Sequence, residues 1–137
     1  MKLIIDSNII ISALIRDSKT RELILESGFE LYYPKASLNN LEKYKEEIII
    51  KAGINNEEFE KIYHIILSKI IIVENIKFLD RLDEAKNIMG HIDIEDVPFI
   101  ALALSVENDG IWTDDSDFNR QDSIKVWKTE DILKSLM

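Results

Sequence analysis

Three aspartates, Asp114, Asp115 and Asp117, lie close together in the sequence G-I-W-T-D-D-S-D-F of residues 110–118. The apolar and β-branched residues before them predict a short buried strand over residues 110–113. Ligands bind beyond the carboxyl ends of the strands in an open parallel sheet, which is where these acids would lie. Neighbouring carboxylates repel one another unless a cation neutralises them. The pattern predicts a cation site, with an ordinary polar turn as the alternative.

Acids occur in the same context at two other places in the chain. Asp6 follows the apolar segment 2–5, which predicts a buried strand. Asp96 precedes the apolar run 99–104, which predicts a deeply buried helix with Pro98 in its first turn. Acids from three segments at one sheet edge would form a pocket of oxygen ligands suited to Mg²⁺ or Mn²⁺. Such an ion lowers the pKa of a bound water and clamps the oxygens of a phosphodiester.

The alternation of strands and helices predicts how these acids are positioned. Strands are expected at residues 2–5, 29–33, 70–73, 110–113 and 124–127. Helices are expected at residues 8–15 (capped by Ser7 or Asn8), 18–27 (capped by Ser18), from 37 up to Gly53, from Asn55 or Asn56 onward, 79–89, within 93–105, and 129–136. A strand running through to Ile15 competes with the first helix, but an aspartate inside a buried strand is costly, which favours a break at Asp6. We therefore expect an α/β fold, a three-layer α/β/α arrangement around a mostly parallel sheet of about four to five strands. Right-handed crossovers would bring strands 2–5 and 110–113 to its middle.

Composition limits the class of protein. The 137 residues, 46% of them hydrophobic, predict one globular domain over 1–137 without disulfides, because the chain has no cysteine. The net charge of −9 argues against a nucleic-acid binder that relies on a basic surface, but not against an enzyme whose acids hold metals. The short apolar runs predict no signal peptide and no membrane span, so we expect a cytoplasmic protein. No glycine-rich nucleotide-binding motif is present.

Three motifs in order resemble the signatures of PIN domains, a family that includes VapC-like toxins of toxin–antitoxin pairs. They are L-I-I-D-S-N near the amino terminus, D-x-x-D-x-P-F-I-A-L-A-L at 93–104 and T-D-D-S-D-F at 113–118. Their order and spacing extend the resemblance over essentially the whole chain. The resemblance implies a compact α/β/α metal-dependent nuclease.

Carried over by position, the resemblance assigns catalytic and metal-binding roles to four aspartates: Asp6, Asp96, Asp115 and Asp117. Thr113, together with Ser7 or Asn8, would orient the carboxylates from outside the ligand set. Asp114 falls on a variable position of the motif and is expected on the turn surface. Asp93 is expected to be a helix cap outside the metal site.

The chain departs from the family at one site position. PIN domains usually carry a glutamate before a core leucine on the helix after the second strand, whereas this chain has Asn40 before Leu41. Glu42 lies two residues on, about 200° around a helix, so it cannot simply replace residue 40. Either the register is shifted and Glu42 serves, or Asn40 is a neutral oxygen ligand. We place Asn40 at the site and expect Glu42 to be a solvated helix acid.

The leading hypothesis is a Mg²⁺- or Mn²⁺-dependent endoribonuclease that hydrolyses RNA phosphodiesters through activated water. If the chain is a toxin, the resemblance implies an antitoxin protein that covers the site, and a homodimer. Candidate contacts to RNA phosphates are the basic residues Arg16, Lys35, Lys43 and Arg120. The alternative is a catalytically weak or inactive PIN domain that serves as a binding or scaffold module. A different phosphotransferase is disfavoured, because the chain reads D-S-N after its first strand rather than D-x-D.

Overall fold

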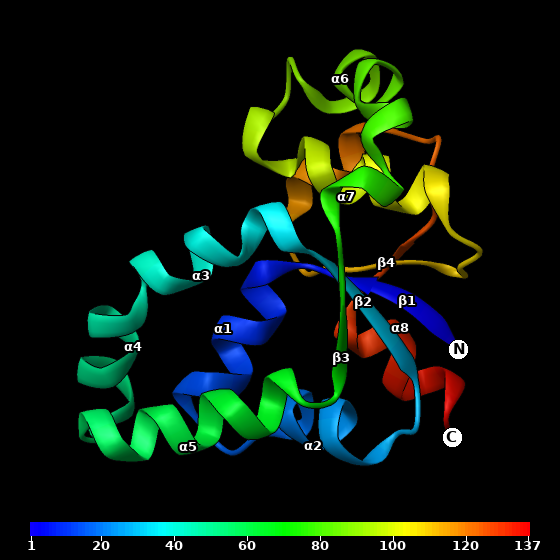
Figure 1. Cartoon of the computed structure of the whole chain (residues 1–137). Coiled ribbons are helices and arrows are strands. Elements are labelled where there is room, and N and C mark those ends of the chain that lie inside the picture. Colours follow the sequence, from blue (N-terminus) through cyan, green and yellow to red (C-terminus); the bar gives the residue numbers. More distant parts are fainter.

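A parallel sheet of five strands forms the middle layer of the computed structural model, which describes all 137 residues (Figure 1). The strands are β1 (Lys2–Ile5), β2 (Glu30–Pro34), β3 (Ile70–Val73), β4 (Gly110–Trp112) and β5 (Val126–Trp127). Their spatial order is β3-β2-β1-β4-β5, and all four pairings are parallel. The prediction that the strands near Asp6 and Asp115 occupy the middle of the sheet is therefore confirmed.

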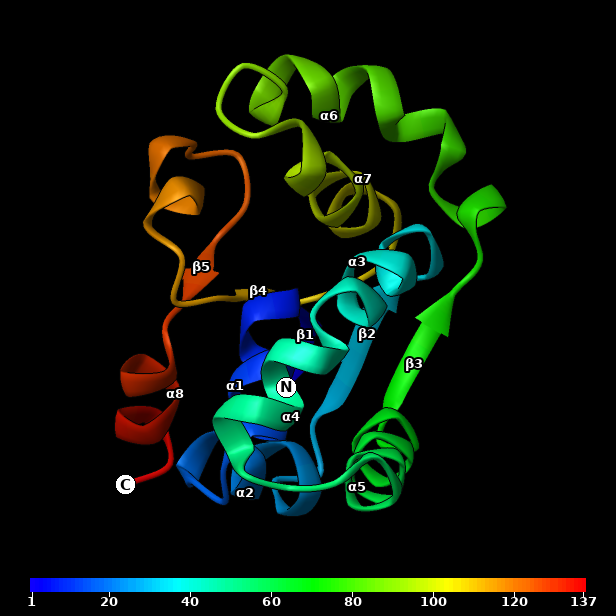
Figure 2. The same ribbon diagram turned by 90° about the vertical axis from the view of Figure 1, so that its left-hand side faces the viewer.

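Helices cover both faces of the sheet, as Figure 2 shows most clearly. The α-helices are α1 (Ser7–Ile15), α2 (Lys19–Glu26), α3 (Leu38–Lys43), α4 (Lys45–Ala52), α5 (Asn56–Leu67), α6 (Leu82–Met89), α7 (Val97–Ser105) and α8 (Thr129–Ser135). Short 3₁₀ helices are η1 (Lys35–Ser37), η2 (Asn75–Lys77), η3 (Leu79–Arg81), η4 (Ile94–Asp96) and η5 (Ser116–Arg120). Helices α6 and α7 form one outer layer, and α1, α2, α5 and α8 lie on the opposite side of the sheet.

The buried helix predicted after Asp96 is present as α7. Six of its nine residues are buried: Val97, Phe99, Ile100, Ala101, Leu102 and Ala103. Pro98 lies in the first turn, where a missing N–H costs no helical hydrogen bond. Because α7 packs on β1, β2 and β4, it fixes the position of the acid at its amino end relative to the strand ends.

Helix boundaries differ from the sequence-based expectation in several places. The residue that caps α1 is Asp6 itself, in extended conformation, rather than Ser7 or Asn8. Ser18 occupies the cap position of α2, but its side chain makes no capping bond. Asn55 caps α5 in a reciprocal capping box with Glu58. The predicted helix over 79–89 begins as the 3₁₀ turn η3.

The prediction of a single helix from residue 37 to Gly53 is wrong in one respect, because the helix breaks at Tyr44 into α3 and α4. The backbone N–H of Tyr44 donates to the carbonyl of Leu41, three residues back, which is the tighter 3₁₀ pattern. The segment contains no proline or glycine before Gly53, so the break is not encoded by a helix-breaking residue. Leu41 in the first half and Ile48 in the second half are both buried.

Strand ends also differ by a residue or two from the expected ranges. The last strand was expected over residues 124–127, but only Val126 and Trp127 pair with β4 and form β5. Gly28 and Gly53 both have positive φ, 75° and 67°, as expected for left-handed helix stops. No helix of the chain has the length and apolar character needed to cross a membrane.

Candidate active site

The carboxyl ends of β1 and β4 bring acids from distant parts of the chain together. Asp6 directly follows β1 and is 3% exposed, while Asp115 begins η5 just beyond β4. Asp117 lies in η5, and Asp96 ends η4 at the amino end of α7. The four predicted aspartates therefore lie at one edge of the sheet, the edge at which parallel sheets bind ligands.

Thr113 joins the two strand ends through its hydroxyl. Its Oγ1 donates to Oδ2 of Asp6 at 2.7 Å and accepts the backbone N–H of Asp115 at 3.0 Å. Asp115 in turn accepts the backbone N–H of Asp117 on Oδ1 at 2.9 Å. This chain of bonds fixes three acid-bearing backbone positions, the arrangement expected of groups that orient ligands from outside the ligand set.

The side chain of Ser7 has a different partner from the one expected. Its Oγ lies 2.6 Å from the hydroxyl of Tyr33, which donates to the carbonyl of Ser37 at 2.9 Å. The Asp6 side chain makes no capping hydrogen bond at the start of α1, although the nearby backbone N–H groups of Ser7 and Asn8 favour its charged form. Ser7 is therefore bonded to Tyr33 rather than to the acid that it was expected to orient.

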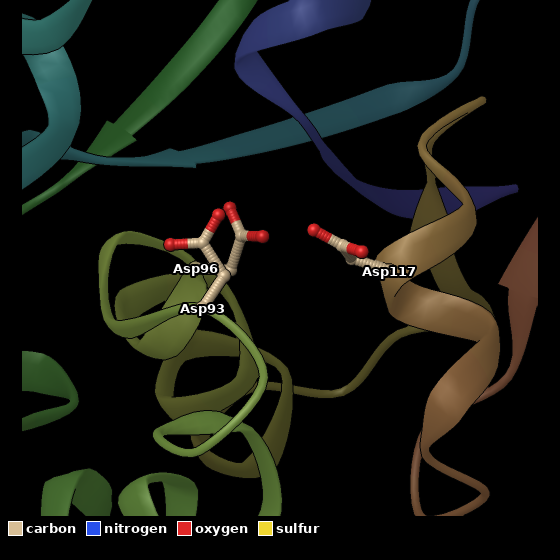
Figure 3. A group of neighbouring side chains, drawn as sticks. All are labelled: Asp93, Asp96 and Asp117. Atoms are coloured by element: carbon tan, nitrogen blue, oxygen red, sulfur yellow. The ribbon is translucent and has the colours of Figure 1, made fainter.

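Asp93, Asp96 and Asp117 form the tightest group of carboxylates in the chain. One oxygen from each lies within 4.8 Å of the others, and Asp117 reaches from η5 toward the other two (Figure 3). Asp93 also caps η4, accepting the N–H of Glu95 on Oδ1 at 3.0 Å. Its capping role was expected, but its place in the acid group was not. The spacing of three residues from Asp96, which puts both side chains on one face of a helical turn, was the available signal.

Burial and mutual repulsion raise the pKa values of two of the acids, Asp6 and Asp96. Burial raises the pKa of Asp96 to about 8, helped by the charges of Asp6, Asp93, Asp115 and Asp117. Burial also raises the pKa of Asp6 to about 6, and the Thr113 hydroxyl and the start of α1 oppose that rise. In the absence of a cation, Asp96 is therefore the acid expected to hold a proton at neutral pH.

One oxygen of the group has no hydrogen-bond partner. Oδ2 of Asp96 is buried and unbonded, which is rare and costly for a carboxylate oxygen. A hard divalent cation fits this donor set, because it takes carboxylate oxygens, removes their repulsion and bonds the orphaned atom. Asp96, Asp93 and Asp117 are the residues that would hold such an ion, with Asp6 and Asp115 beside them.

Asn40 and Glu42 both lie on α3, which begins near the carboxyl end of β2 (Figure 2). Asn40 is half-buried, and no side-chain hydrogen bond joins it to the acids. Glu42 is exposed and lines a groove with Lys45, Phe59 and Tyr63, and burial together with the charge of Glu42 raises the pKa of Tyr63. The charges that act on Asp96 do not include Glu42. Glu42 therefore faces α5.

The four basic residues singled out in the sequence are exposed. Lys35 makes an ion pair with Glu74 at 3.2 Å, whereas Arg16, Lys43 and Arg120 make none.

Asp114 was expected on the turn surface and is exposed, but it also has a structural role. Its carboxylate accepts the N–H and the hydroxyl of Thr129, both at 2.8 Å, and so fastens the start of α8.

The fold and the site define an α/β/α protein with a cluster of acids, able to hold a cation, at the carboxyl edge of a parallel sheet. A family model described as PIN domain matches residues 4–137. The chain therefore belongs to the PIN domain family, whose members are generally nucleases and typically use divalent metals. A comparison with curated proteins gives no match.

Proposed function

We propose that this protein is a metal-dependent endoribonuclease that hydrolyses RNA phosphodiesters with Mg²⁺ or Mn²⁺. The observation that carries the proposal is the unbonded, buried Oδ2 of Asp96 beside the carboxylates of Asp93 and Asp117. A cluster of this kind costs folding free energy unless a cation occupies it, and family membership supports nuclease chemistry.

In this proposal the aspartates of the chain bind the cation, and Thr113 orients two of them. Asp6, Asp96, Asp115 and Asp117 are the predicted ligands, and Asp93 joins them on its proximity to Asp96 and Asp117. Asp96 must give up its proton when a cation binds, because its carboxyl is protonated at neutral pH in the free protein. Thr113 holds the Asp6 carboxylate and the Asp115 backbone in place. When bound, the ion activates water and stabilises charge on the phosphate.

RNA is the proposed substrate, with phosphate contacts from the unpaired cations Arg16, Lys43 and Arg120. The overall charge of −9 means that few such contacts are available, so the bound metal would supply much of the attraction for phosphate. A role as the toxin of a toxin–antitoxin pair, with an antitoxin protein and a homodimer, follows from the family resemblance alone and is proposed on that ground.

A catalytically weak PIN domain that serves as a binding or scaffold module is the second candidate. The observation in its favour is Asn40, a neutral residue where PIN domains usually have glutamate. One fewer negative ligand lowers the affinity for a divalent cation. The two candidates differ in whether the acids bind metal and whether RNA is cut.

The test measures cleavage of a mixed RNA panel with Mn²⁺ and the effect of Mn²⁺ on the melting temperature. The site variant is Asp6→Asn with Asp115→Asn, and the matched control is Asp17→Asn with Asp122→Asn, which removes the same charge at exposed positions. We expect EDTA-sensitive cleavage and a Mn²⁺-dependent rise in melting temperature in wild type and control, both lost in the site variant. Cleavage that survives in the site variant would sink the proposal, and the absence of cleavage together with the absence of a Mn²⁺ effect on the melting temperature of wild type would favour the scaffold.

A further inference from the structure

Tyr33, near the carboxyl end of β2, carries a buried hydroxyl that takes no direct part in the acid cluster. The residue is 0% exposed. Burying a hydroxyl costs free energy unless it is hydrogen-bonded, and phenylalanine would fill the same space without that cost. The bonds of the hydroxyl therefore indicate what a tyrosine contributes at this position.

The phenolic oxygen of Tyr33 joins two segments that carry predicted site residues. Its single proton is donated to the carbonyl of Ser37 at 2.9 Å. The 2.6 Å contact with Ser7 must therefore be a bond that the Ser7 hydroxyl donates. Ser7 is the first residue of α1 and directly follows Asp6. Ser37 is the cap residue of α3, the helix that carries Asn40. One phenol thus holds the starts of both helices.

The bond from Ser7 supports Asp6 from the side of the sheet opposite to β4. On the β4 side, the backbone N–H of Asp6 donates to the carbonyl of Trp112 at 3.0 Å. The register of β1 with β2 ends at Ile4, so beyond it the Ser7–Tyr33 bond ties the end of β1 to β2. The backbone that presents Asp6 is therefore fixed from both neighbouring strands.

The ring of Tyr33 contacts the segment that carries Asp96. It packs edge-on against Phe99, with the ring centroids 5.5 Å apart, and Phe99 lies three residues after Asp96 in α7. Phe99 in turn packs edge-on against Phe118, with the ring centroids 6.4 Å apart. Phe118 directly follows Asp117 in η5. All three rings are buried, and close-packed rings of this kind transmit a displacement to their neighbours.

We propose that Tyr33 is a positioning residue of the acid site, whose hydroxyl and ring hold the segments of Asp6 and Asp96 in one geometry for a divalent cation. The inference rests on the metal binding in the proposed function. Tyr33 makes no hydrogen bond to an acid, so it acts on the placement of the ligands and not on their number. Groups that orient ligands from outside the ligand set change metal affinity by about 10- to 100-fold.

The first experiment measures Mn²⁺ binding to the full chain by isothermal titration calorimetry. Tyr33→Phe removes the hydroxyl and keeps the ring. The matched control is Ile132→Val, which removes a buried methyl group from α8 and so lowers stability through packing alone. We expect Mn²⁺ affinity about tenfold lower in Tyr33→Phe and unchanged in the control, with both variants folded by circular dichroism. Wild-type affinity in Tyr33→Phe, or an equal loss in the control, overturns the proposal.

The second experiment tests whether the two hydroxyls act as one unit. Ser7→Ala removes the donor to the phenol and leaves Tyr33 in place. We expect Ser7→Ala alone to weaken Mn²⁺ binding, and the double variant with Tyr33→Phe to bind no more weakly than Tyr33→Phe alone. Residues that share one hydrogen bond are not additive, which is what this comparison detects. Losses that multiply in the double variant would show that the hydroxyls act separately, and would overturn the link from Tyr33 to the start of α1.

RNA cleavage by the same proteins separates this inference from the proposed function. A wild type that binds Mn²⁺ without cutting RNA would contradict the proposed nuclease, while the binding data would still decide the role of Tyr33. A wild type that binds Mn²⁺ and cuts RNA, with equal Mn²⁺ affinity in Tyr33→Phe, would overturn the role of Tyr33 alone. A wild type that binds no Mn²⁺ would overturn both.

Discussion

Oγ1 of Thr113 donates a hydrogen bond of 2.7 Å to Oδ2 of Asp6, although the two residues are 107 positions apart in the sequence. Both side chains are buried, and they lie at the carboxyl ends of the neighbouring strands β4 and β1. The same hydroxyl oxygen accepts the N–H of Asp115. One small side chain therefore fixes an acid from each end of the chain, and the geometry of the site depends on it.

Replacing Thr113 with valine removes this hydroxyl while keeping the shape of the side chain. We expect the Thr113→Val variant to bind Mn²⁺ about 10- to 100-fold more weakly, because groups that orient ligands have effects of that size. The unfolding free energy should fall by about 1–3 kcal/mol, since the N–H of Asp115 loses its partner. Isothermal titration calorimetry and urea unfolding measure the two effects. Thr113→Ser keeps the hydroxyl and should stay close to wild type; equal losses in both variants would argue against the role of the hydrogen bond.

The raised pKa values of Asp6 and Asp96 predict how stability depends on pH in the presence of EDTA. Both carboxyls bind protons more tightly in the folded chain, with pKa values of about 6 and about 8, than at the ordinary value of 3.8. The folded state therefore holds more protons than the unfolded state between pH 4 and 8, and its stability must fall as pH rises through that window. The expected loss is on the order of a few kcal/mol.

Asp96→Asn tests that pH dependence, because the amide cannot ionise. Urea unfolding from pH 5 to 8.5 should give a flatter profile for Asp96→Asn than for wild type, and a more stable variant at pH 8. Asp17→Asn, at an exposed position, is the control and should follow wild type. A wild-type stability that rises between pH 5 and 8 would contradict the assignment.

Asp114 and Asp115 are neighbours with opposite expected roles. Asp114 accepts two hydrogen bonds from Thr129 at the start of α8, while Asp115 lies beside the acids of the site. Asp114→Ala should therefore lower the unfolding free energy by about 0.5–2 kcal/mol, the usual range for a lost helix cap, and leave Mn²⁺ affinity unchanged. Asp115→Ala should weaken Mn²⁺ binding. Calorimetry on both variants separates the roles, and a loss of metal affinity in Asp114→Ala would mean that the division is wrong.

The sequence predicts the sheet and the edge that carries the acids because both depend on local patterns. Short apolar runs ended by aspartate mark β1 and β4, and the apolar run after Asp96 marks α7. The break at Tyr44 and the contact between Ser7 and Tyr33 depend on packing between segments far apart in the chain, which no local pattern records. The place of Asp93 beside Asp96 was not predicted, because a local pattern, the helix cap, already explains an aspartate at this position. A capping role does not exclude a second role in the acid group.

Asn40 is the predicted site position at which this chain departs from the glutamate usual in PIN domains, and introducing the acid tests what that position does. Asn40 is half-buried on α3, near the carboxyl end of β2. If residue 40 faces the acids, Asn40→Glu adds a negative ligand and should tighten Mn²⁺ binding about tenfold, since charge count sets the affinity of oxygen sites.

The same substitution has an opposite effect on the metal-free protein, which makes the test sharper. A further carboxylate beside Asp96 adds repulsion, so the melting temperature of Asn40→Glu in EDTA should fall below that of wild type. Saturating Mn²⁺ should then raise it by more than in wild type. Glu42→Gln, on the exposed side of α3, serves as the control and should change neither quantity. If Asn40→Glu leaves metal affinity unchanged while Glu42→Gln reduces it, the register is shifted and Glu42 is the acid that serves the site.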